Sequence, residues 1–446
     1  MKLFTKRLTQ TQMIVLGYCI IIFLGAGLLM LPVSTKAGVY TPFTDALFTS
    51  TSAACVTGLV IADTFQYWST FGQCVILCII QIGGLGFMTI GVCFAILLRR
   101  KIGLWTRGTL QESVNIMQVG GIVRLAKKII VGTAIFEGMG ALILAVRFSR
   151  EMSLGKAVYF GVFHSISAFC NAGFDLMGES GAYSSFTKYY NDPVVNLVIM
   201  SLIVIGGIGF FVWNDISVNK LKFRKYRLHT KIVLISTAIL IFGGAALLFF
   251  FEKNNTIAGM PFGDQVLCSL FGSVTARTAG FNTVDTAALT DSSKLLTTIL
   301  MFIGGSPGST AGGVKTTTFV VLLIYVHANL RKEMHCNILG RRLDEDSIRK
   351  ASAVLCINLF AVILAVLVIV TVQPAAMTDV AFEGVSAIGT VGMSTGITRD
   401  METVSKLVLI FLMYCGRIGS MTFALSLRGH KIEAPVKAPV EKIMIG

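Results

Sequence analysis

Four short stretches of this 446-residue chain share one pattern and decide its fold. Three of them are Phe48-Thr-Ser-Thr-Ser-Ala-Ala-Cys-Val-Thr-Gly58, Phe163-His-Ser-Ile-Ser-Ala-Phe-Cys-Asn-Ala-Gly173 and Phe382-Glu-Gly-Val-Ser-Ala-Ile-Gly-Thr-Val-Gly392. In each, a Phe precedes a Gly by ten residues, with Ser-Ala in the same register. The remaining one, Phe271-Gly-Ser-Val-Thr-Ala-Arg-Thr-Ala-Gly280, is one residue shorter.

A second glycine element follows each of these loops. It reads Gly83-Gly-Leu-Gly86, Gly206-Gly-Ile-Gly209, Gly304-Gly-Ser-Pro-Gly308 and Gly416-Arg-Ile-Gly419, beginning 25, 33, 24 and 24 residues after the loop glycine. Two motifs repeated in step four times indicate four copies of one unit. We place these repeats at residues 8–98, 124–218, 230–328 and 350–428, with a tail at 429–446.

Long apolar runs surround the loops and indicate a membrane protein, because a bilayer span needs about 20 predominantly apolar residues. The chain is 54% hydrophobic and only 14% charged. Five runs lack Asp, Glu, Lys and Arg entirely: 8–35, 64–98, 193–214, 232–251 and 351–378. Three more carry a single charge: 129–146, 295–326 and 407–427. The sequence thus predicts an all-α polytopic membrane protein with eight spans, whose first run is retained as a span.

Charge is distributed unequally between the predicted inner and outer segments. With the amino terminus inside, the inner segments hold 26 of the 38 Lys and Arg residues, and this asymmetry predicts that both termini are cytoplasmic. The net charge of +15 does not indicate nucleic-acid binding, because no inner segment is long enough for a folded basic domain. The ten cysteines form no CxxC pair, which argues against disulfide and zinc sites.

The four loops are too short to cross a membrane, so they are expected to enter it and return. Irregular backbone at membrane depth must be buried in protein or line a water-filled cavity, so the loops should meet on one axis. Each reads as a short helix, started by Pro42 and Asp45, by Pro261 and Asp264, or by Asp379, followed by an extended stretch.

Rings of backbone carbonyls in such extended stretches are how potassium filters replace the hydration shell of the ion. Glycine suits this role because it permits unusual dihedrals and leaves no side chain in the lumen. The alternative is that the glycines serve close helix packing. The predicted filter residues are Val56, Thr57, Gly58, Asn171, Ala172, Gly173, Thr278, Ala279, Gly280, Thr390, Val391 and Gly392, with potassium bound at the glycines.

The fourfold loop, the Thr275–Thr283 run and the glycine-rich break in the sixth span resemble the Trk/Ktr/HKT potassium-transporter superfamily over essentially the whole chain. Eight spans without an extra amino-terminal pair resemble its KtrB type of membrane subunit. The resemblance implies a fourfold pore in a bacterial cytoplasmic membrane, with a filter glycine in each repeat. Gly58 in the first repeat implies potassium rather than sodium. The resemblance also implies a homodimer on a cytosolic ring of KtrA-type nucleotide-binding regulatory subunits.

The sixth span is interrupted by a stretch that cannot hold a regular helix, because it contains Pro307 and five glycines. We expect this stretch to obstruct the pore beneath the filter and to act as a gate. Its predicted residues are Gly304, Gly305, Ser306, Pro307, Gly308, Ser309, Thr310, Gly312, Gly313 and Lys315, which is expected to anchor the loop. The same stretch resembles a hydrolase elbow and a phosphate loop, but it lacks a nearby base and a correctly placed lysine, so no enzyme is predicted.

Charges inside the predicted spans are candidate functional groups by default. Arg417 is expected to line the pore below the filter; the alternative is pairing with Glu383 or with helix carbonyls. Arg277 is expected to pair with an acidic residue behind the filter, and Glu137 to be a helix-packing partner. Four aspartates that follow the filters either concentrate cations at the outer mouth or form a solvated rim: Asp63, Asp175, Asp285 and Asp400.

The function predicted from the residues and the resemblance together is potassium uptake, with no cofactor bound by this chain and with membrane lipid as a partner. An ion-coupled secondary transporter is the alternative, because discontinuous helices are typical of that class. It would predict two inverted halves, whereas the chain shows four parallel repeats. The mixed-charge segment 331–350 and the basic tail are candidate surfaces for the cytosolic partner.

Overall fold

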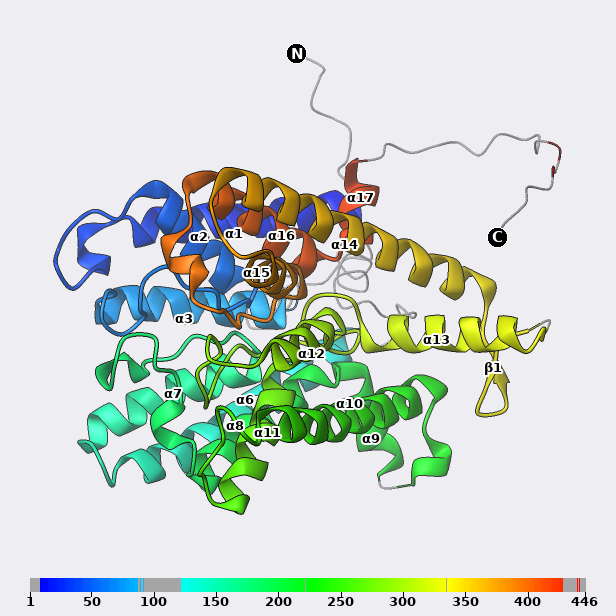
Figure 1. Cartoon of the computed structure of the whole chain (residues 1–446), viewed down its shortest axis with the longest axis horizontal. Helices are drawn as coiled ribbons and strands as arrows, with labels where there is room; N and C mark the ends of the chain where they lie inside the picture. The colour runs from blue at the N-terminus through cyan, green and yellow to red at the C-terminus, as the bar shows by residue number, and fades with distance from the viewer. Residues whose placement is uncertain are drawn as a thin grey trace, which may run out of the picture.

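The computed structural model describes residues 9–86, 122–220, 222–333 and 335–427, together with the single positions 89, 91, 439 and 441. Its described part is almost entirely helical (Figure 1), with one two-stranded antiparallel hairpin, β1 (Asn337–Ile338) and β2 (Arg341–Arg342). Five short 3-10 turns lie in the connections: Pro32–Ser34, Met177–Glu179, Thr187–Tyr189, Phe223–Lys225 and Ile397–Asp400. The predicted tail 429–446 lies almost wholly outside the described residues.

One long helix opens each of the four repeats. These helices are α1 (Gln10–Leu29), α6 (Ile122–Phe148), α10 (Leu228–Glu252) and α14 (Glu345–Val372). By length and composition, they are the four helices in the described part of the chain that can cross a membrane singly. A fifth span results if the bent pair α8 (Pro193–Gly207) and α9 (Phe210–Asn219) is taken as one.

A shorter helix follows each long one and leads into the loop. These helices are α2 (Phe43–Ala54), α7 (Leu154–Phe169), α11 (Phe262–Thr275) and α15 (Met377–Gly389). Pro42 and Pro261 precede α2 and α11, and an Asp occupies the first turn of α2, α11 and α15, as the sequence predicts. Their carboxyl ends point the negative end of the helix dipole toward the loops, where it favours a cation.

In every repeat, the helix that follows the loop ends at the second glycine element, and in three repeats another helix begins beyond it. The helices are α3 (Thr70–Leu85), the pair α8 and α9, α12 (Asp291–Phe302) with α13 (Thr316–Leu330), and α16 (Thr403–Ile418) with α17 (Ser420–Leu427). The α8–α9 bend measures 94°. The sequence analysis predicted a break only in the third repeat, and this was incomplete. Gly86, Gly209 and Gly419 have φ of 78°, 96° and 94°, which an α-helix cannot contain.

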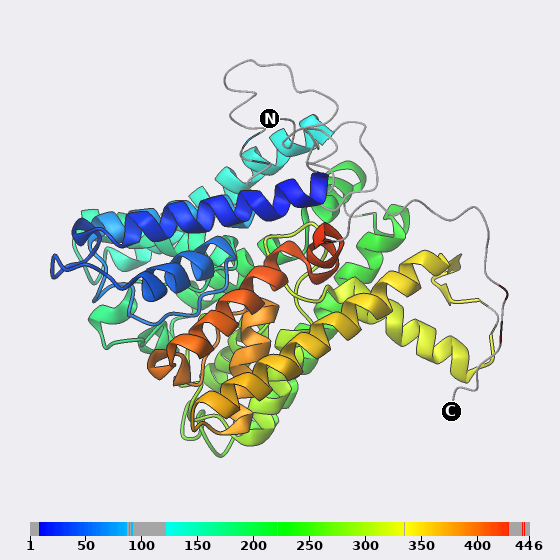
Figure 2. The ribbon, with the colours of Figure 1, turned by 90° about the horizontal axis from the view of Figure 1, so that it is seen from above.

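The repeats pack in a closed ring. The second helix of each repeat contacts the short helix of the next: α3 on α7, α8 on α11, α12 on α15, and α16 back on α2. The core lies between them, and the Phe that begins each motif is buried there, at Phe48, Phe163, Phe271 and Phe382. Figure 2 shows α13 and the adjoining part of α14 extending side by side beyond this body. The ring therefore brings all four loops to one place.

Candidate functional site

The four loop strands, defined as residues 56–58, 171–173, 278–280 and 390–392, have the same unusual backbone. Their first residues, Val56, Asn171, Thr278 and Thr390, have φ of 53°, 59°, 75° and 51°. Two positions later, Gly58, Gly173, Gly280 and Gly392 have φ of 93°, 70°, 83° and 88°. Non-glycine residues rarely adopt positive φ. Its recurrence at the same motif position in four repeats indicates that all four strands must adopt one particular backbone conformation.

The glycines of the loop strands face one another around a closed ring. A Cβ placed on Gly58 would lie 2.5 Å from the Ala172 carbonyl oxygen, and one on Gly173 would lie 2.7 Å from that of Ala279. A Cβ on Gly280 would lie 2.5 Å from the Val391 oxygen, and one on Gly392 would meet the Thr57 oxygen. Each glycine thus abuts the carbonyl that precedes the next glycine, in chain order and back to the start.

A hydroxyl group from each short helix fastens its own loop strand. Ser52 and Ser386 accept hydrogen bonds from the amides of Gly58 and Gly392, both at 3.1 Å. Ser167 and Thr275 instead donate to the carbonyls of Phe174 and Phe281, at 2.7 and 2.6 Å. These four residues hold the Ser-Ala register of the motif, so the pattern was visible in the sequence although its role was not inferred.

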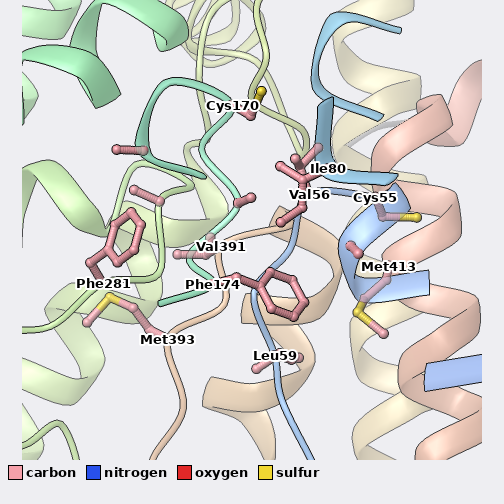
Figure 3. Close-up of a cluster of buried hydrophobic side chains, with 14 of the residues drawn as sticks. Cys55, Val56, Leu59, Ile80, Cys170, Phe174, Phe281, Val391, Met393 and Met413 are labelled. Atoms are coloured by element: carbon pink, nitrogen blue, oxygen red, sulfur yellow. The ribbon is translucent and has the colours of Figure 1, made fainter. Parts of the chain in front are cut away.

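The side chains beside the loop strands point into the protein. Val56, Phe174, Phe281 and Val391 are at most 1% exposed. Figure 3 shows them in a buried apolar cluster around the strands, together with Leu59, Ile80 and Met393. The four glycines, which carry no side chain, line a cavity beside these strands.

A cavity of about 210 Å³ opens on one side of the ring and is lined by all four loop glycines. Asp63, Asp175 and Asp285 also line it, whereas Asp400 does not. Asp63 accepts hydrogen bonds from the amides of Phe65, Gln66 and Tyr183, at 2.7–2.9 Å, so part of its charge is used to hold these loops. Burial, with a smaller contribution from neighbouring Asp63, raises the pKa of Asp175 to about 7.

The same cavity carries a positive charge that the sequence analysis did not single out. Arg399 lines it, and its guanidinium carbon lies 3.8 Å from the centroid of the Tyr183 ring. The Tyr183 hydroxyl in turn donates to the Ile61 carbonyl at 2.9 Å. The arginine–aromatic contact therefore joins the fourth repeat to the second, and the tyrosine hydroxyl joins the second to the first. Neither residue belongs to a repeated motif, which is why the pattern gave no signal for them.

On the opposite side of the ring, the segment between α12 and α13 forms a loop held closed at its base. The Gly304 amide donates to the Val314 carbonyl at 2.9 Å, and the Thr316 amide donates to the Gly305 carbonyl at 3.0 Å. We call residues 304–315 the inner loop. Lys315 closes it further, because its Nζ donates to the Ala311 carbonyl at 2.7 Å.

The inner loop is bonded to other repeats across the ring. Ser306 and Thr310 donate backbone hydrogen bonds to the carbonyls of Gly207 and Gly206, at 3.0 and 3.3 Å. The Gly313 amide donates to Gly416 at 3.2 Å, and a Cβ on Gly313 would lie 2.9 Å from the Gly389 Cα. The loop thus joins the second repeat to the fourth beneath the loop strands.

Arg417 adds a link to the first repeat. Its guanidinium donates to the carbonyls of Thr310 and Gly83, and to that of Gly84 at 3.0 Å. The hydrogen-bond partners of Arg417 are therefore helix and loop carbonyls, and not Glu383. Glu383 instead accepts hydrogen bonds from Ser394, Thr395 and Thr398, at 2.5–3.1 Å.

The prediction that Arg277 pairs with an acidic residue was wrong. Within the described residues, no carboxylate lies within 4.0 Å of its guanidinium, although the residue is only 7% exposed.

Glu137 accepts a hydrogen bond from Gln81 of α3 at 3.0 Å, which suits a contact between α3 and α6. His164, a histidine inside a short helix, is not free to act as a base for the hydrolase-like pattern, because the backbone of Phe160 and Leu176 engages both of its ring nitrogens.

A largely helical architecture with several apolar spans, whose four loops close into one ring, is typical of membrane transport proteins. The family TrkH, cation transport protein, matches residues 4–433, and the chain belongs to this family. It is therefore a multi-pass membrane protein of the cation-transport class.

Several curated relatives align along nearly the whole chain. Potassium/sodium uptake protein NtpJ of Enterococcus hirae is 39% identical, over 99% of this chain and 98% of the relative. Ktr system potassium uptake protein B of Bacillus subtilis is 40% identical, over 94% of this chain and 93% of the relative. The protein of that name in Vibrio alginolyticus is 33% identical, over 98% and 95%. The crystal structure of the potassium transporter TrkH from Vibrio parahaemolyticus superimposes with a TM-score of 0.74, at 19% identity, over 96% of this chain and 86% of that one.

Proposed function

We propose that this chain takes up potassium across the bacterial cytoplasmic membrane, through a filter made of the carbonyls of the four loop strands. The observation that carries the proposal is the fourfold backbone pattern: positive φ at the first residue and at the glycine of each strand, with the glycines in a closed ring. Carbonyl rings that replace the hydration shell are the established basis of potassium selection. The uptake activities in the names of the aligned relatives support the same cargo.

In the proposed orientation, the mouth lined by Asp63, Asp175 and Asp285 is extracellular and both termini are cytoplasmic. Acidic groups around a narrow opening raise the local cation concentration. The mouth belongs to the side on which the short helices begin, so their carboxyl ends aim down the pore toward the cation. The positive-inside charge distribution supports the same orientation.

The inner loop is proposed to be the gate. It lies beneath the loop strands and contains no regular helix. It is hydrogen-bonded directly to the second and fourth repeats, and Arg417 links it to the first. Arg417 acts as the latch in this proposal, because one guanidinium bridges the loop and the first repeat while placing a positive charge beside the ion path. Opening requires these few bonds to break, which a regulatory partner can drive.

The regulatory partner is proposed to be a KtrA-type nucleotide-binding ring under a homodimer of this chain. The projecting α13–α14 pair, with the β1–β2 hairpin at its tip, offers a docking surface. Arg341 and Arg342 lie on the hairpin, and Asp344, Glu345 and Asp346 begin α14. The hydrogen bond from Ser347 lowers the pKa of Asp344 and keeps this acidic group charged.

Flux in reconstituted liposomes tests the proposal. Potassium flux that follows the membrane potential, with sodium much slower, is the expected result. Flux that requires an imposed proton or sodium gradient would favour the coupled secondary transporter instead. Equal movement of both ions would mean that the loop strands do not select potassium.

A further inference from the structure

A second cavity, of about 630 Å³, lies between α6 and the bent pair α8–α9. We call it the α6–α9 groove. Its apolar lining includes Ile129, Ile135, Phe136, Ile205, Phe210 and Trp213. Ile135 is 53% exposed, so this side of α6 is not covered by the rest of the described chain.

The break in the second repeat creates this groove. Because α9 turns away from α8 by 94°, it cannot continue along α6 as a straight helix would. Trp213 braces the bend, since its Nε1 donates to the Ile205 carbonyl at 2.9 Å. Gly132 leaves room for the indole, because a Cβ there would lie 3.1 Å from the Trp213 ring. The groove floor is therefore a fixed aromatic surface.

One end of the groove is strongly basic. Arg124, Lys127 and Lys128, in the first turns of α6, all line it, and no acidic residue of the described chain does. Lys128 donates to the Asn214 side chain at 3.0 Å, while none of the three has an ion pair within the described residues. The nearby carboxylate of Asp215 is engaged elsewhere, by Asn219 and by the Arg227 amide.

We propose that the α6–α9 groove binds an anionic phospholipid of the cytoplasmic leaflet. Its phosphate contacts Arg124, Lys127 and Lys128, and an acyl chain lies along the apolar wall against Trp213. Basic pockets beside an apolar transmembrane surface have the two features that such a lipid needs. This site goes beyond the proposed ion path, and it relies on that proposal only for the orientation that makes this end of α6 cytoplasmic.

Charge complementarity favours a lipid over the other possible occupants. A second copy of the chain placed symmetrically on this face would bring two identical basic clusters together, which is unfavourable. The residues that immediately precede α6 in sequence, 99–121, carry Arg99, Arg100, Lys101 and Arg107 against a single Glu112, so they have the same sign as the groove.

The groove also adjoins the gate proposed above. Gly209, at the α8–α9 bend, has no room for a Cβ because the Pro307 carbonyl oxygen would lie 2.6 Å away. The Phe210 amide donates to the Gly308 carbonyl at 2.7 Å. A lipid that stabilises the bend on one side therefore stabilises the seat of the inner loop on the other.

Quenching of Trp213 fluorescence tests the site directly. The full chain, with Trp68 and Trp105 changed to Phe, is reconstituted in vesicles containing dibromo-acyl phosphatidylglycerol or dibromo-acyl phosphatidylcholine. We expect stronger quenching by the phosphatidylglycerol at equal mole fraction. Each basic residue near an anionic surface adds roughly fivefold in affinity, so Arg124→Gln, Lys127→Gln and Lys128→Gln together should remove at least about tenfold of the preference.

The matched control removes three positive charges outside the groove. Lys222→Gln, Arg224→Gln and Lys225→Gln should leave the preference for phosphatidylglycerol intact, and size-exclusion profiles verify that both triple variants are folded. Equal quenching by the two lipids in the unsubstituted groove would overturn the proposal, as would an equal loss of preference in the control. Absence of quenching by either lipid would also overturn it and would indicate that protein covers the groove.

Discussion

The loop strands and the second glycine elements repeat four times each, yet they have diverged to different degrees. All four loop strands share one backbone conformation, and a hydroxyl at the same motif position bonds either the strand glycine or the residue after it. At the second element, Gly83, Gly206 and Gly416 each abut the carbonyl of a residue at the end of their own short helix, whereas Gly304 abuts Gly312 of the inner loop. Binding an ion on an axis needs four equivalent groups. Obstructing that axis needs only one repeat to reach across it.

The largest effect should follow from breaking the equivalence of the loop strands. Gly392→Ala adds a Cβ against the Thr57 carbonyl at a residue with φ of 88°. Unfavourable φ alone costs about 1–2 kcal/mol, so with the added clash we expect potassium uptake to fall by about tenfold or more. Uptake of rubidium-86 by liposomes measures this.

Gly38→Ala is the matched control for that substitution. Gly38 also has positive φ, at 68°, but a Cβ there would meet nothing within 4 Å. It should retain both the rate and the potassium preference. Equal losses in the two variants would mean that backbone strain, and not the ring of carbonyls, explains the effect.

Shortening the inner loop of the third repeat should have the next largest effect, and it should raise the flux rather than lower it. Deleting residues 306–310 removes the hydrogen bonds from the inner loop to Gly206, Gly207 and Arg417. We expect flux to rise several-fold with selectivity maintained, because the loop strands are untouched. Unchanged flux would contradict the gate.

Arg417→Ala should produce a smaller rise than the deletion. It removes the bridge between Thr310 and Gly83 together with the positive charge beside the proposed ion path. Arg417→Lys is the informative companion, because an ammonium keeps the charge but lacks the planar fork that spans two carbonyls. A gain of flux in both variants assigns the effect to the bridge, whereas a gain in the alanine variant alone assigns it to charge.

The fastening hydroxyls should affect selectivity more than rate. Ser386→Ala removes the acceptor for the Gly392 amide, and the loss of one such hydrogen bond costs about 1 kcal/mol. We expect a severalfold loss of preference for potassium over sodium, measured by competition. Ser405→Ala serves as the control, because the Ser405 hydroxyl is buried without a hydrogen-bond partner among the described residues. A similar loss of potassium preference in Ser405→Ala would contradict a specific role for the hydroxyls that bond the loop strands.

The smallest effect concerns pH at the mouth. Because the pKa of Asp175 is raised to about 7, its carboxyl is mostly neutral at pH 6 and mostly charged at pH 8. Uptake from dilute potassium should therefore rise modestly between these values as negative charge develops at the mouth. Asp175→Asn should flatten the profile, while Asp285→Asn should not. A profile that Asp175→Asn leaves unchanged would exclude this group as the cause.

Much of this architecture could be predicted from the sequence, because repetition and apolar length leave strong patterns. The long helices, the short helices and the loop strands all follow from them. The breaks at Gly86, Gly209 and Gly419 were missed because two or three glycines within an apolar run also fit a continuous span. Only the third element, with Pro307 and more glycines, departs enough from a helical pattern to be read as a break.

Contacts between repeats could not be predicted in the same way. Arg417 bonds Thr310 and Gly83, which lie 107 and 334 positions before it in the sequence. Arg399 packs over Tyr183, more than 200 positions away. A lone charge in a span signals importance but does not identify its partner. For Arg277 the same reasoning predicted a carboxylate partner, and the described residues supply none within 4.0 Å.

The most direct test of the central claim is to locate bound ions in crystals of the protein grown in rubidium or thallium salts. The account predicts an anomalous peak on the axis enclosed by Gly58, Gly173, Gly280 and Gly392, within coordination distance of their strand carbonyls, and its loss when sodium replaces the heavier ion. Ions found instead at a side-chain site such as Glu137, with the ring empty, would contradict it.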